Sequence, residues 1–430
     1  MRSKNTARRV MLAGVAVAAL AMTAGCTSGG GGGGGGDDQT LTILWTQGYS
    51  EGLEAVMAEF KKENPDVTFE TTYAEGDAYF AAIRTQLQAG TAPDVLHVWP
   101  GNGNVGATIP LAQNGSLMDL SDQPWASTLP DSAKPYATYD GKTYSFPTTL
   151  SIVGAVYNDE ALAASGLAIP ETWDQVIQFC KDARDKGTVA YSLGLTSTHE
   201  SQFVGYALYP QLVQGPQPNL DEEVAAGTTT FNDSGWKDAL GKNVEMAEAG
   251  CFNDSAQGAD MFEASRILSE GESIGMVTIG QYMGIINNPG LTLAPLPGSN
   301  DPSESKIAVA PSTSAAVNAK AKNPELAKKF VAFLATPEMN ELFECNVADG
   351  LGSLPITATD GPGKCDESAF DQAALTYVQE GRTGGFPDQT WPSPDVQMAL
   401  QLGMQEAVFG GRTVDSVLTD MTNAMLSSAG

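Results

Sequence analysis

The chain has few positive charges, few histidines and few cysteines for its length. Its 430 residues include 23 Lys and Arg against 51 Asp and Glu, a formal net charge of −28 at pH 7, with two His and five Cys. Nucleic acids and anionic membrane surfaces are bound through a cationic face, so this balance argues against both. His97 and His199 are too few for a His-rich metal site, and no cysteine pair has CxxC spacing. We therefore expect no nucleic-acid partner, no metal and no cofactor.

A long uncharged apolar run occurs at the N-terminus, over residues 10–25. It follows a cationic start, is shorter than the roughly 20 residues of a membrane span and suits a signal-peptide core. It ends in Thr23-Ala24-Gly25-Cys26, which is similar to the bacterial lipobox, although Thr23 stands where that motif usually has Leu. We therefore predict a lipoprotein signal peptide over residues 1–25 and lipidation at Cys26. Secretion without lipidation, and export by either the general or the twin-arginine route, stay open.

The segment after Cys26 has almost no side chains that could form a core. Residues 26–39 contain an unbroken glycine run, which predicts a flexible tether. A folded domain on such a tether would stay near the membrane and still reorient.

Four cysteines remain, Cys180, Cys251, Cys345 and Cys365. An even number in an exported chain indicates two disulfides, for which three pairings exist. We predict Cys180–Cys251 and Cys345–Cys365, the pairs nearest in sequence. Four buried free thiols are the alternative.

Hydrophobic periodicity predicts alternating strands and helices in the first part of the mature chain. The predicted strands are residues 41–45, 67–73 and 95–99, and the helices between them carry apolar stripes over 53–60 and 79–87. This β-α-β-α-β order favours a mostly parallel sheet covered on both faces.

The same pattern continues to the C-terminus. Thr172-Trp173-Asp174-Gln175 has the form of a capping box and predicts a helix through Lys186. The other predicted strands are 152–157, 191–195 and 274–279, and the other predicted helices are 236–249, 262–269, 324–334 and two within 395–426. The chain is therefore predicted to be an α/β protein of two lobes, with Trp173 and Trp236 in packing roles.

Two local motifs suggest enzymes, but their context argues against both. Residues 101–106 match the dinucleotide pattern GxGxxG, yet they follow the third predicted strand and not the first. Residues 271–275 match GxSxG, but a helix precedes and a strand follows, the reverse of a hydrolase nucleophile elbow. We interpret the first as a loop whose backbone approaches a ligand and the second as a turn.

The order of several short motifs resembles a known family. Ala92-Pro93-Asp94-Val95, Pro170-Glu171-Thr172-Trp173-Asp174 and Asn323-Pro324-Glu325-Leu326-Ala327 follow the lipobox and the tether. This order resembles the extracellular solute-binding proteins of bacterial ABC importers, in the carbohydrate group related to maltose-binding protein. The resemblance covers nearly the whole mature chain, from about Thr40 to the end.

The resemblance implies a two-lobed, periplasmic-binding-protein-like fold of type II, each lobe a mostly parallel sheet flanked by helices. The chain would cross between lobes near Pro147, near Leu293 and near Thr336. Residues 40–148 and 295–336 would form the first lobe, and residues 149–294 and 337–430 the second.

The resemblance also implies a function. The protein would be a monomer, lipid-anchored on the outer face of the cell membrane, that captures a sugar or oligosaccharide and delivers it to an ABC permease. It would not be an enzyme. A glycan-acting exported enzyme and a binding protein for a non-sugar solute are the alternatives.

Most of the candidate binding residues follow predicted strands, because the carboxyl ends of parallel strands face the ligand crevice, and Trp391 lies in the loop before the terminal helices. A pyranose is recognised by aromatic rings on its C–H faces and by carboxylates and amides around its hydroxyls. Several candidates also have a structural interpretation: Trp45 in the core, Asp77 as a helix cap, Asn102 as a turn former, and Glu200 and Gln202 in a solvated loop. The resemblance adds a turn and a loop near the ligand. The candidates are Trp45, Thr46, Glu75, Asp77, Asn102, Glu200, Gln202, Gln281, Tyr282, Ser353 and Trp391.

Overall fold

The computed structural model describes residues 39–74, 76–130, 133–280, 290–347, 353–356 and 369–428. The predicted signal peptide, Cys26 and the tether lie outside these residues. Within them, no helix is both long and apolar enough to cross a membrane.

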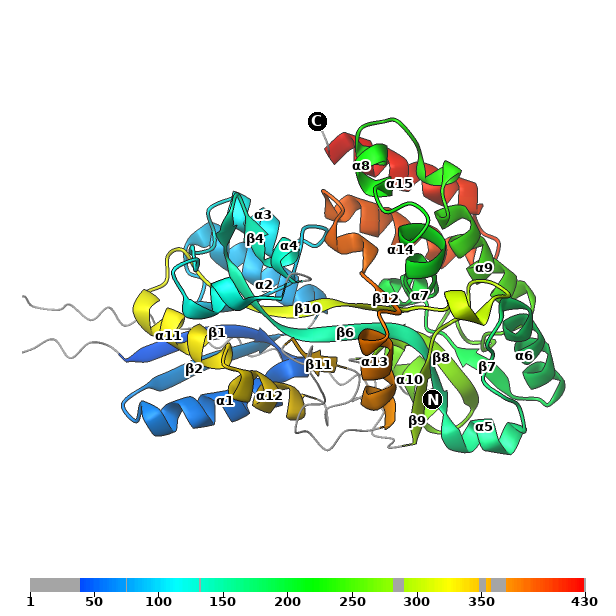
Figure 1. Cartoon of the computed structure of the whole chain (residues 1–430), viewed down its shortest axis with the longest axis horizontal. Helices are drawn as coiled ribbons and strands as arrows, with labels where there is room; N and C mark the ends of the chain where they lie inside the picture. Colours follow the sequence, from blue (N-terminus) through cyan, green and yellow to red (C-terminus); the bar gives the residue numbers. More distant parts are fainter. Residues whose placement is uncertain are drawn as a thin grey trace, which may run out of the picture. The chain divides into compact units, whose positions relative to one another are not determined.

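A mixed β-sheet runs through the length of the molecule (Figure 1). Its main strands lie in the order β2-β1-β3-β10-β6-β8-β7, and β9, β11 and β12 pair with the two central strands. The bounds are β1 (Thr40–Thr46), β2 (Thr68–Ala74), β3 (Val95–Val98), β6 (Ser145–Asn158), β7 (Val189–Ser192), β8 (Ser273–Ile279), β9 (Leu291–Ala294), β10 (Ile307–Val317), β11 (Ser353–Pro355) and β12 (Thr383–Gly384). A separate hairpin joins β4 (Thr138–Tyr139) to β5 (Lys142–Thr143).

The α/β class is confirmed, but the sheet is more mixed than predicted. The pairs β1–β2, β1–β3 and β7–β8 are parallel, as the β-α-β pattern requires. The central pairs β3–β10, β10–β6 and β6–β8 are antiparallel. The reason is that β6 and β10 run in opposite directions through the middle of the sheet and link its two parallel parts.

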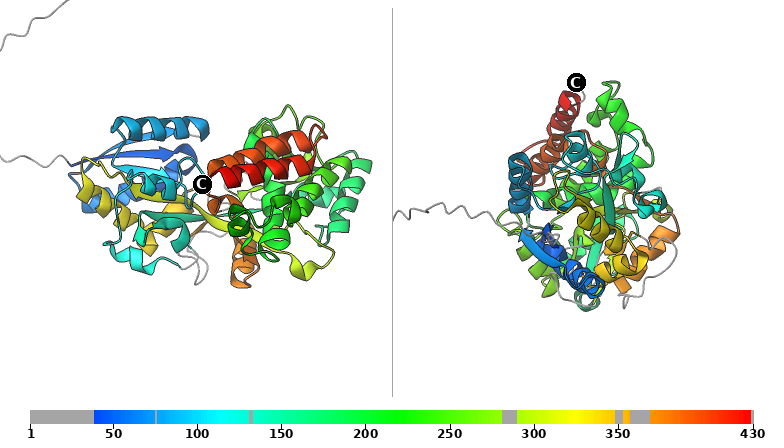
Figure 2. Two further views of the ribbon diagram at one scale, coloured as in Figure 1. Left: turned by 90° about the horizontal axis from the view of Figure 1, so that it is seen from above. Right: turned by 90° about the vertical axis from the view of Figure 1, so that its left-hand side faces the viewer.

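Helices cover the faces of both parts of the sheet (Figure 2). The first lobe carries α1 (Ser50–Glu63), α2 (Gly76–Ala89), α3 (Thr108–Gln113), α4 (Lys134–Ala137), α11 (Pro324–Leu334) and α12 (Pro337–Cys345). The second carries α5 (Asp159–Ser165), α6 (Trp173–Asp185), α7 (Phe203–Tyr209), α8 (Leu220–Ala225), α9 (Trp236–Glu248), α10 (Met261–Ser269), α13 (Ala369–Gln379), α14 (Pro394–Ala407) and α15 (Val414–Ser428). The helices and strands predicted from periodicity are present. Most ends are shifted by one to three residues, but β6 begins at Ser145, seven residues before the predicted strand 152–157.

Local sequence explains where these helices begin. The Thr172 hydroxyl accepts a hydrogen bond from the Gln175 N–H, so the predicted cap of α6 is present. Val176, Phe179 and Ala183 then recur at helical spacing and are buried.

Each lobe has its own hydrophobic core. In the first lobe Trp45, Phe60, Phe330 and Phe343 pack together between the sheet and α1, α11 and α12. In the second, Trp173 and Trp236 are buried in a larger core, which confirms their predicted packing roles.

The two lobes are joined by the strands β6 and β10. Phe146 of β6 pairs with Ala315 of β10 at the first lobe, and Val153 pairs with Ala308 at the second. The register shifts in between, at Pro311 and Thr313. The crossing predicted near Pro147 therefore lies within this pair.

The structure corrects two of the predicted lobe boundaries. Helix α12 packs against α1, and its Met339 and Phe343 belong to the first core, so residues 337–347 are part of the first lobe (Figure 1). Leu296 belongs to the second core, and the Gln211 side chain accepts a hydrogen bond from the Gly298 N–H. The chain therefore returns to the first lobe through β10 and not near Leu293.

The structure contains the predicted Cys180–Cys251 disulfide. It ties α6 to the segment that follows α9, across a sequence separation of 71 residues. Cys345 is also disulfide-bonded. Its predicted partner, Cys365, lies outside the described residues.

We predict that the double substitution Cys180→Ser and Cys251→Ser lowers the free energy of unfolding by about 2–4 kcal/mol, because it releases a long loop in the unfolded chain. Urea denaturation of the variant and of the parent protein measures the difference. An unchanged midpoint would show that this disulfide does not contribute to stability.

Candidate functional site

A cavity of about 290 Å³ lies between the two lobes. The first lobe contributes the end of β3, the loop after it and one residue of α2. The second lobe contributes α7, α14 and the segments before each, and Ser312 lies on β10. The lining residues are Phe80, Trp99, Pro100, Asn104, Thr198, His199, Gln202, Phe203, Tyr206, Ile279, Ser312, Phe386, Asp388, Gln389, Gln397 and Gln401.

The first-lobe wall of the cavity is aromatic. The rings of Phe80 and Trp99 lie 4.6 Å apart at an angle of 34°. The imidazole of His97 lies behind them, 4.2 Å from the Trp99 ring, and burial lowers the pKa of His97 to about 3. His97 is therefore neutral at physiological pH, and Trp99 rests on an uncharged, rigid support.

The second-lobe wall is rich in amide side chains. Gln397 and Gln401 lie four residues apart on α14 and so share one face of that helix. The Gln401 amide donates to the Gln202 side-chain oxygen over 2.9 Å, and the Gln397 amide donates to the Tyr206 hydroxyl over 3.2 Å. This wall can both donate and accept hydrogen bonds.

Asp388 is the one carboxylate among the described residues that line the cavity. Burial raises the pKa of Asp388 to about 6, and a hydrogen bond from the Tyr206 hydroxyl acts in the opposite direction. Its Oδ1 atom is buried and has no hydrogen-bond partner among the described residues. A hydroxyl donor in the cavity would satisfy it.

Glu200 lies just behind the lining, beside His199. It is 1% exposed, and neither carboxylate oxygen makes a hydrogen bond within the described part of the chain. Its Oε1 lies 4.0 Å from Nε2 of His199. Burial raises the pKa of Glu200 from 4.5 to about 8.

The glycine-rich loop after β3 touches the second lobe. The Asn102 N–H donates to the Gln389 carbonyl oxygen over 3.1 Å. A Cβ atom on Gly103 would overlap the Asp388 carbonyl oxygen. The glycine pattern therefore serves a close backbone approach between the lobes, whereas the sequence analysis predicted an approach to a ligand.

The structure brings some of the predicted residues to this cavity. Gln202 lines it, Glu200 lies behind Gln202, and Asn102 is half-buried in the contact beside it.

Trp45, Thr46 and Trp391 are corrections to the sequence-based prediction. Trp45 is completely buried and packs against Phe343, because its side chain points to the α12 face of the sheet. Thr46 is 2% exposed and does not line the cavity. Trp391 is completely buried beside Trp236. The alternative of Trp45 as a core residue is confirmed, and we do not propose these three residues as ligand contacts.

The remaining candidates stay untested. Glu75, Gln281 and Tyr282 lie outside the described residues, and Asp77 and Ser353 are described by their backbone alone.

Several lining residues were missed by the sequence analysis. Trp99 follows the third strand, and residues at the carboxyl ends of parallel strands face the crevice. The sequence could therefore have identified Trp99 by the same argument that identified Trp45. Phe386 and Asp388 lie in a loop with no pattern of its own. The Gln pair on α14 has helical spacing, but its polar face is the kind that solvent-exposed helices also carry.

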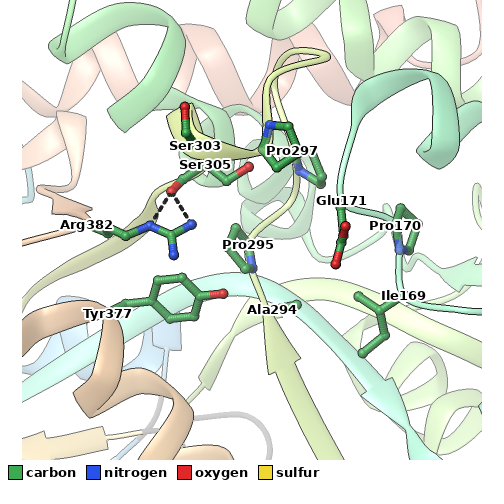
Figure 3. Close-up of a pocket in the computed structure, with 11 residues that line it drawn as sticks. Ile169, Pro170, Glu171, Ala294, Pro295, Pro297, Ser303, Ser305, Tyr377 and Arg382 are labelled. Atoms are coloured by element: carbon green, nitrogen blue, oxygen red, sulfur yellow. Dashed lines mark hydrogen bonds between the residues drawn. The ribbon is translucent and has the colours of Figure 1, made fainter. Parts of the chain in front are cut away.

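A second pocket, of about 700 Å³, lies on the second lobe (Figure 3). Prolines line much of it, and the Arg382 guanidinium there donates to the Ser305 carbonyl oxygen and stacks on Tyr377. All of its described lining residues belong to the second lobe or the segments that pack on it, so this pocket does not lie between the lobes. We therefore take the cavity between the lobes as the candidate site.

We predict that Gly103→Ala lowers the free energy of unfolding by about 1–3 kcal/mol, because the added methyl group has no room against the Asp388 backbone. Gly241→Ala is the matched control: nothing lies within 4 Å of its Cβ position in α9, and alanine favours helix. Denaturant titration measures both. Equal stability of the two variants would contradict the close contact.

We also predict a pH-dependent effect of Glu200→Gln. A carboxyl group whose pKa rises on folding holds its proton more tightly in the folded chain. Its contribution to the free energy of unfolding is therefore full below about pH 4.5 and is lost as the pH rises toward about 8. The variant should therefore be more stable than the parent near pH 8, by up to a few kcal/mol, and should lose this advantage near pH 4.5. Thermal melts across this range test it, and a constant difference at all pH values would contradict it.

The chain is similar to sugar-binding proteins of other bacteria. The multiple sugar-binding protein of Streptococcus mutans is 23% identical over 144 residues, 34% of this chain and 33% of that protein. The melibiose/raffinose/stachyose-binding protein MelE of Bacillus subtilis is 24% identical over 315 residues, 70% of this chain and 71% of MelE. The first of these alignments thus spans about a third of the relative.

Solved structures share the fold. RafE, a Streptococcus pneumoniae protein, in its complex with raffinose gives a TM-score of 0.71 at 19% identity, over 91% of this chain and 100% of that one. This likeness places the fold among the type II periplasmic solute-binding proteins. The family described as bacterial extracellular solute-binding protein matches residues 46–341. The chain belongs to this family.

Proposed function

We propose that this protein captures a sugar or oligosaccharide in the cavity between its lobes and delivers it to an ABC permease. The main support for the proposal is that an aromatic wall and an amide-rich wall lie on opposite sides of the cavity. Aromatic rings, Trp99 and Phe80, form one side, and amide side chains of the other lobe face them.

This pairing matches the chemistry of a pyranose. The ring has apolar C–H faces that pack on aromatic rings, and a rim of hydroxyls that both donate and accept hydrogen bonds. Because the two walls belong to different lobes, a bound sugar would hold the lobes together, in the manner of hinge-closing binding proteins.

We further propose that the protein is anchored to the outer face of the cell membrane through a lipid on Cys26. The support is the motif at residues 23–26 and the glycine-rich tether, which ends where β1 begins at Thr40. A monomer with this anchor would meet the permease by lateral diffusion. The family supports an extracellular role and an importer as partner.

Sugar binding through the aromatic wall is tested by Trp99→Ala. We expect the variant to lose at least tenfold in affinity for a sugar that binds the parent, because a stacked aromatic contributes about 1 kcal/mol or more beyond area burial. Phe262→Ala is the control, because Phe262 is 57% exposed, on α10, and does not line the cavity. Isothermal titration measures both affinities.

Two results would count against the proposal. If no sugar in a broad panel raises the melting temperature of the parent protein, the sugar-binding function fails, because a ligand of the folded state must stabilise it. If the purified protein hydrolyses an oligosaccharide that it binds, it is an enzyme and not a receptor.

A further inference from the structure

Gln389 contacts three different parts of the molecule. It ends a short 3-10 helix, η10 (Pro387–Gln389), in the second lobe. Its backbone carbonyl oxygen accepts a hydrogen bond from the Asn102 N–H of the first lobe over 3.1 Å. Its side-chain amide donates a hydrogen bond to the carbonyl oxygen of Pro311 on β10. Gln389 also lines the cavity, so one residue touches the first lobe, the strand that joins the lobes and the candidate site.

The bond to Pro311 fixes the orientation of the Gln389 amide. A carbonyl oxygen can only accept hydrogen bonds, so the amide must turn its NH₂ group toward Pro311. The other end of the amide, Oε1, is buried and has no hydrogen-bond partner among the described residues, and Gln389 as a whole is 6% exposed. A buried acceptor without a partner is costly to the folded chain. A hydroxyl donor that reaches this wall of the cavity would satisfy it.

Pro311 lies where the two joining strands lose their regular register. The pairing of β10 with β6 shifts between Pro311 and Thr313, and again between Thr313 and Ser314. An irregularity of this kind interrupts the ladder of hydrogen bonds and bends the strand. A change in the angle between the lobes therefore meets least resistance here, and the Gln389 amide holds β10 at this point.

Backbone contacts with the first lobe set the position of η10. A Cβ atom on Gly101 would overlap the Gln389 carbonyl oxygen, and one on Gly103 would overlap the Asp388 carbonyl oxygen. Only glycines allow the loop to come close enough for the Asn102 N–H to reach Gln389. The Gln389 amide is thus held from both lobes, between the cavity and β10.

We propose that Gln389 couples a sugar in the cavity to the strand pair that joins the lobes. A sugar hydroxyl donates to Oε1, while the NH₂ group of the same amide donates to the Pro311 carbonyl oxygen. The two hydrogen bonds polarise one amide, so each strengthens the other. The sugar therefore binds more tightly when Gln389 is bonded to β10, and by linkage it stabilises that bond. This inference rests on the proposed function and goes beyond it, because the cavity could bind a sugar without acting on β10.

The first test follows backbone hydrogen exchange along β10 with and without sugar. The probe is the tightest binder of the parent protein among glucose, galactose, maltose and raffinose, added at saturation. Gln389→Met keeps the length of the side chain and removes both polar ends. Gln401→Met is the matched control, because Gln401 also lines the cavity but its amide bonds to Gln202 of the same lobe.

We expect the sugar to slow exchange in residues 307–317 of the parent and of Gln401→Met at least threefold more than it slows exchange in α6. In Gln389→Met this extra slowing should disappear. A residue with a purely structural role would raise exchange of β10 equally in the free and the sugar-bound protein, and the extra slowing would persist. Its persistence in sugar-saturated Gln389→Met would overturn the inference and leave the proposed function intact. If no sugar in a broad panel binds the parent, the proposed function fails and the inference falls with it.

The second test needs no variant and decides the question if Gln389→Met does not fold or does not bind sugar. The hydroxyls of the bound sugar are removed one at a time in a series of monodeoxy derivatives, and affinity and exchange are measured on the parent protein. We expect one derivative to bind at least threefold more weakly and, at saturation, to produce no extra slowing in residues 307–317. Derivatives that lack another hydroxyl should keep the slowing. If every derivative that binds slows β10 as much as the complete sugar does, no hydroxyl acts through Gln389 and the inference is wrong.

Discussion

The antiparallel pairing of β6 with β10 is the constraint on which the rest of the structure depends. These two strands are the long elements that continue from one hydrophobic core into the other, and their register fixes how the parallel parts of the sheet meet. Because the pairing is antiparallel, the first lobe must be completed by chain that returns late, through α11 and α12. Ser312 lies at this register shift and lines the cavity, and its hydroxyl is bonded to those of Thr149 and Ser151 of β6.

At the cavity, each lobe carries side chains that its own packing does not fully cover or satisfy. Trp99 is only half-buried on a support of buried rings, and Asp388 and Glu200 are held in surroundings that favour their neutral forms. A buried carboxyl group without a full set of hydrogen bonds is costly to the folded chain. A sugar hydroxyl that donates to Asp388 would recover part of that cost.

Much of the fold could be predicted from the sequence, and less of the site. The stripe in α1, the cap at Thr172 and the apolar run of β8 are local signals, and each produced the element expected. The place of α12 could not be predicted in this way, because its apolar residues suit either lobe. Only the packing of its Phe343 against Trp45 and Tyr49 decides between the lobes. The site depends on which face of a strand end a side chain occupies. Trp45 and Trp99 both end strands of one sheet, but Trp45 points into a core and Trp99 into the cavity, and no local pattern separates them.

The central claim is that the ligand lies between Trp99 of the first lobe and Asp388 of the second. A crystal structure of the protein grown with a sugar that it binds tests this most directly. The account predicts density for a sugar ring stacked on Trp99, with a hydroxyl within hydrogen-bond distance of Asp388. Density for the sugar in the proline-lined pocket beside Tyr377 and Arg382, with the cavity between the lobes holding only water, would contradict it.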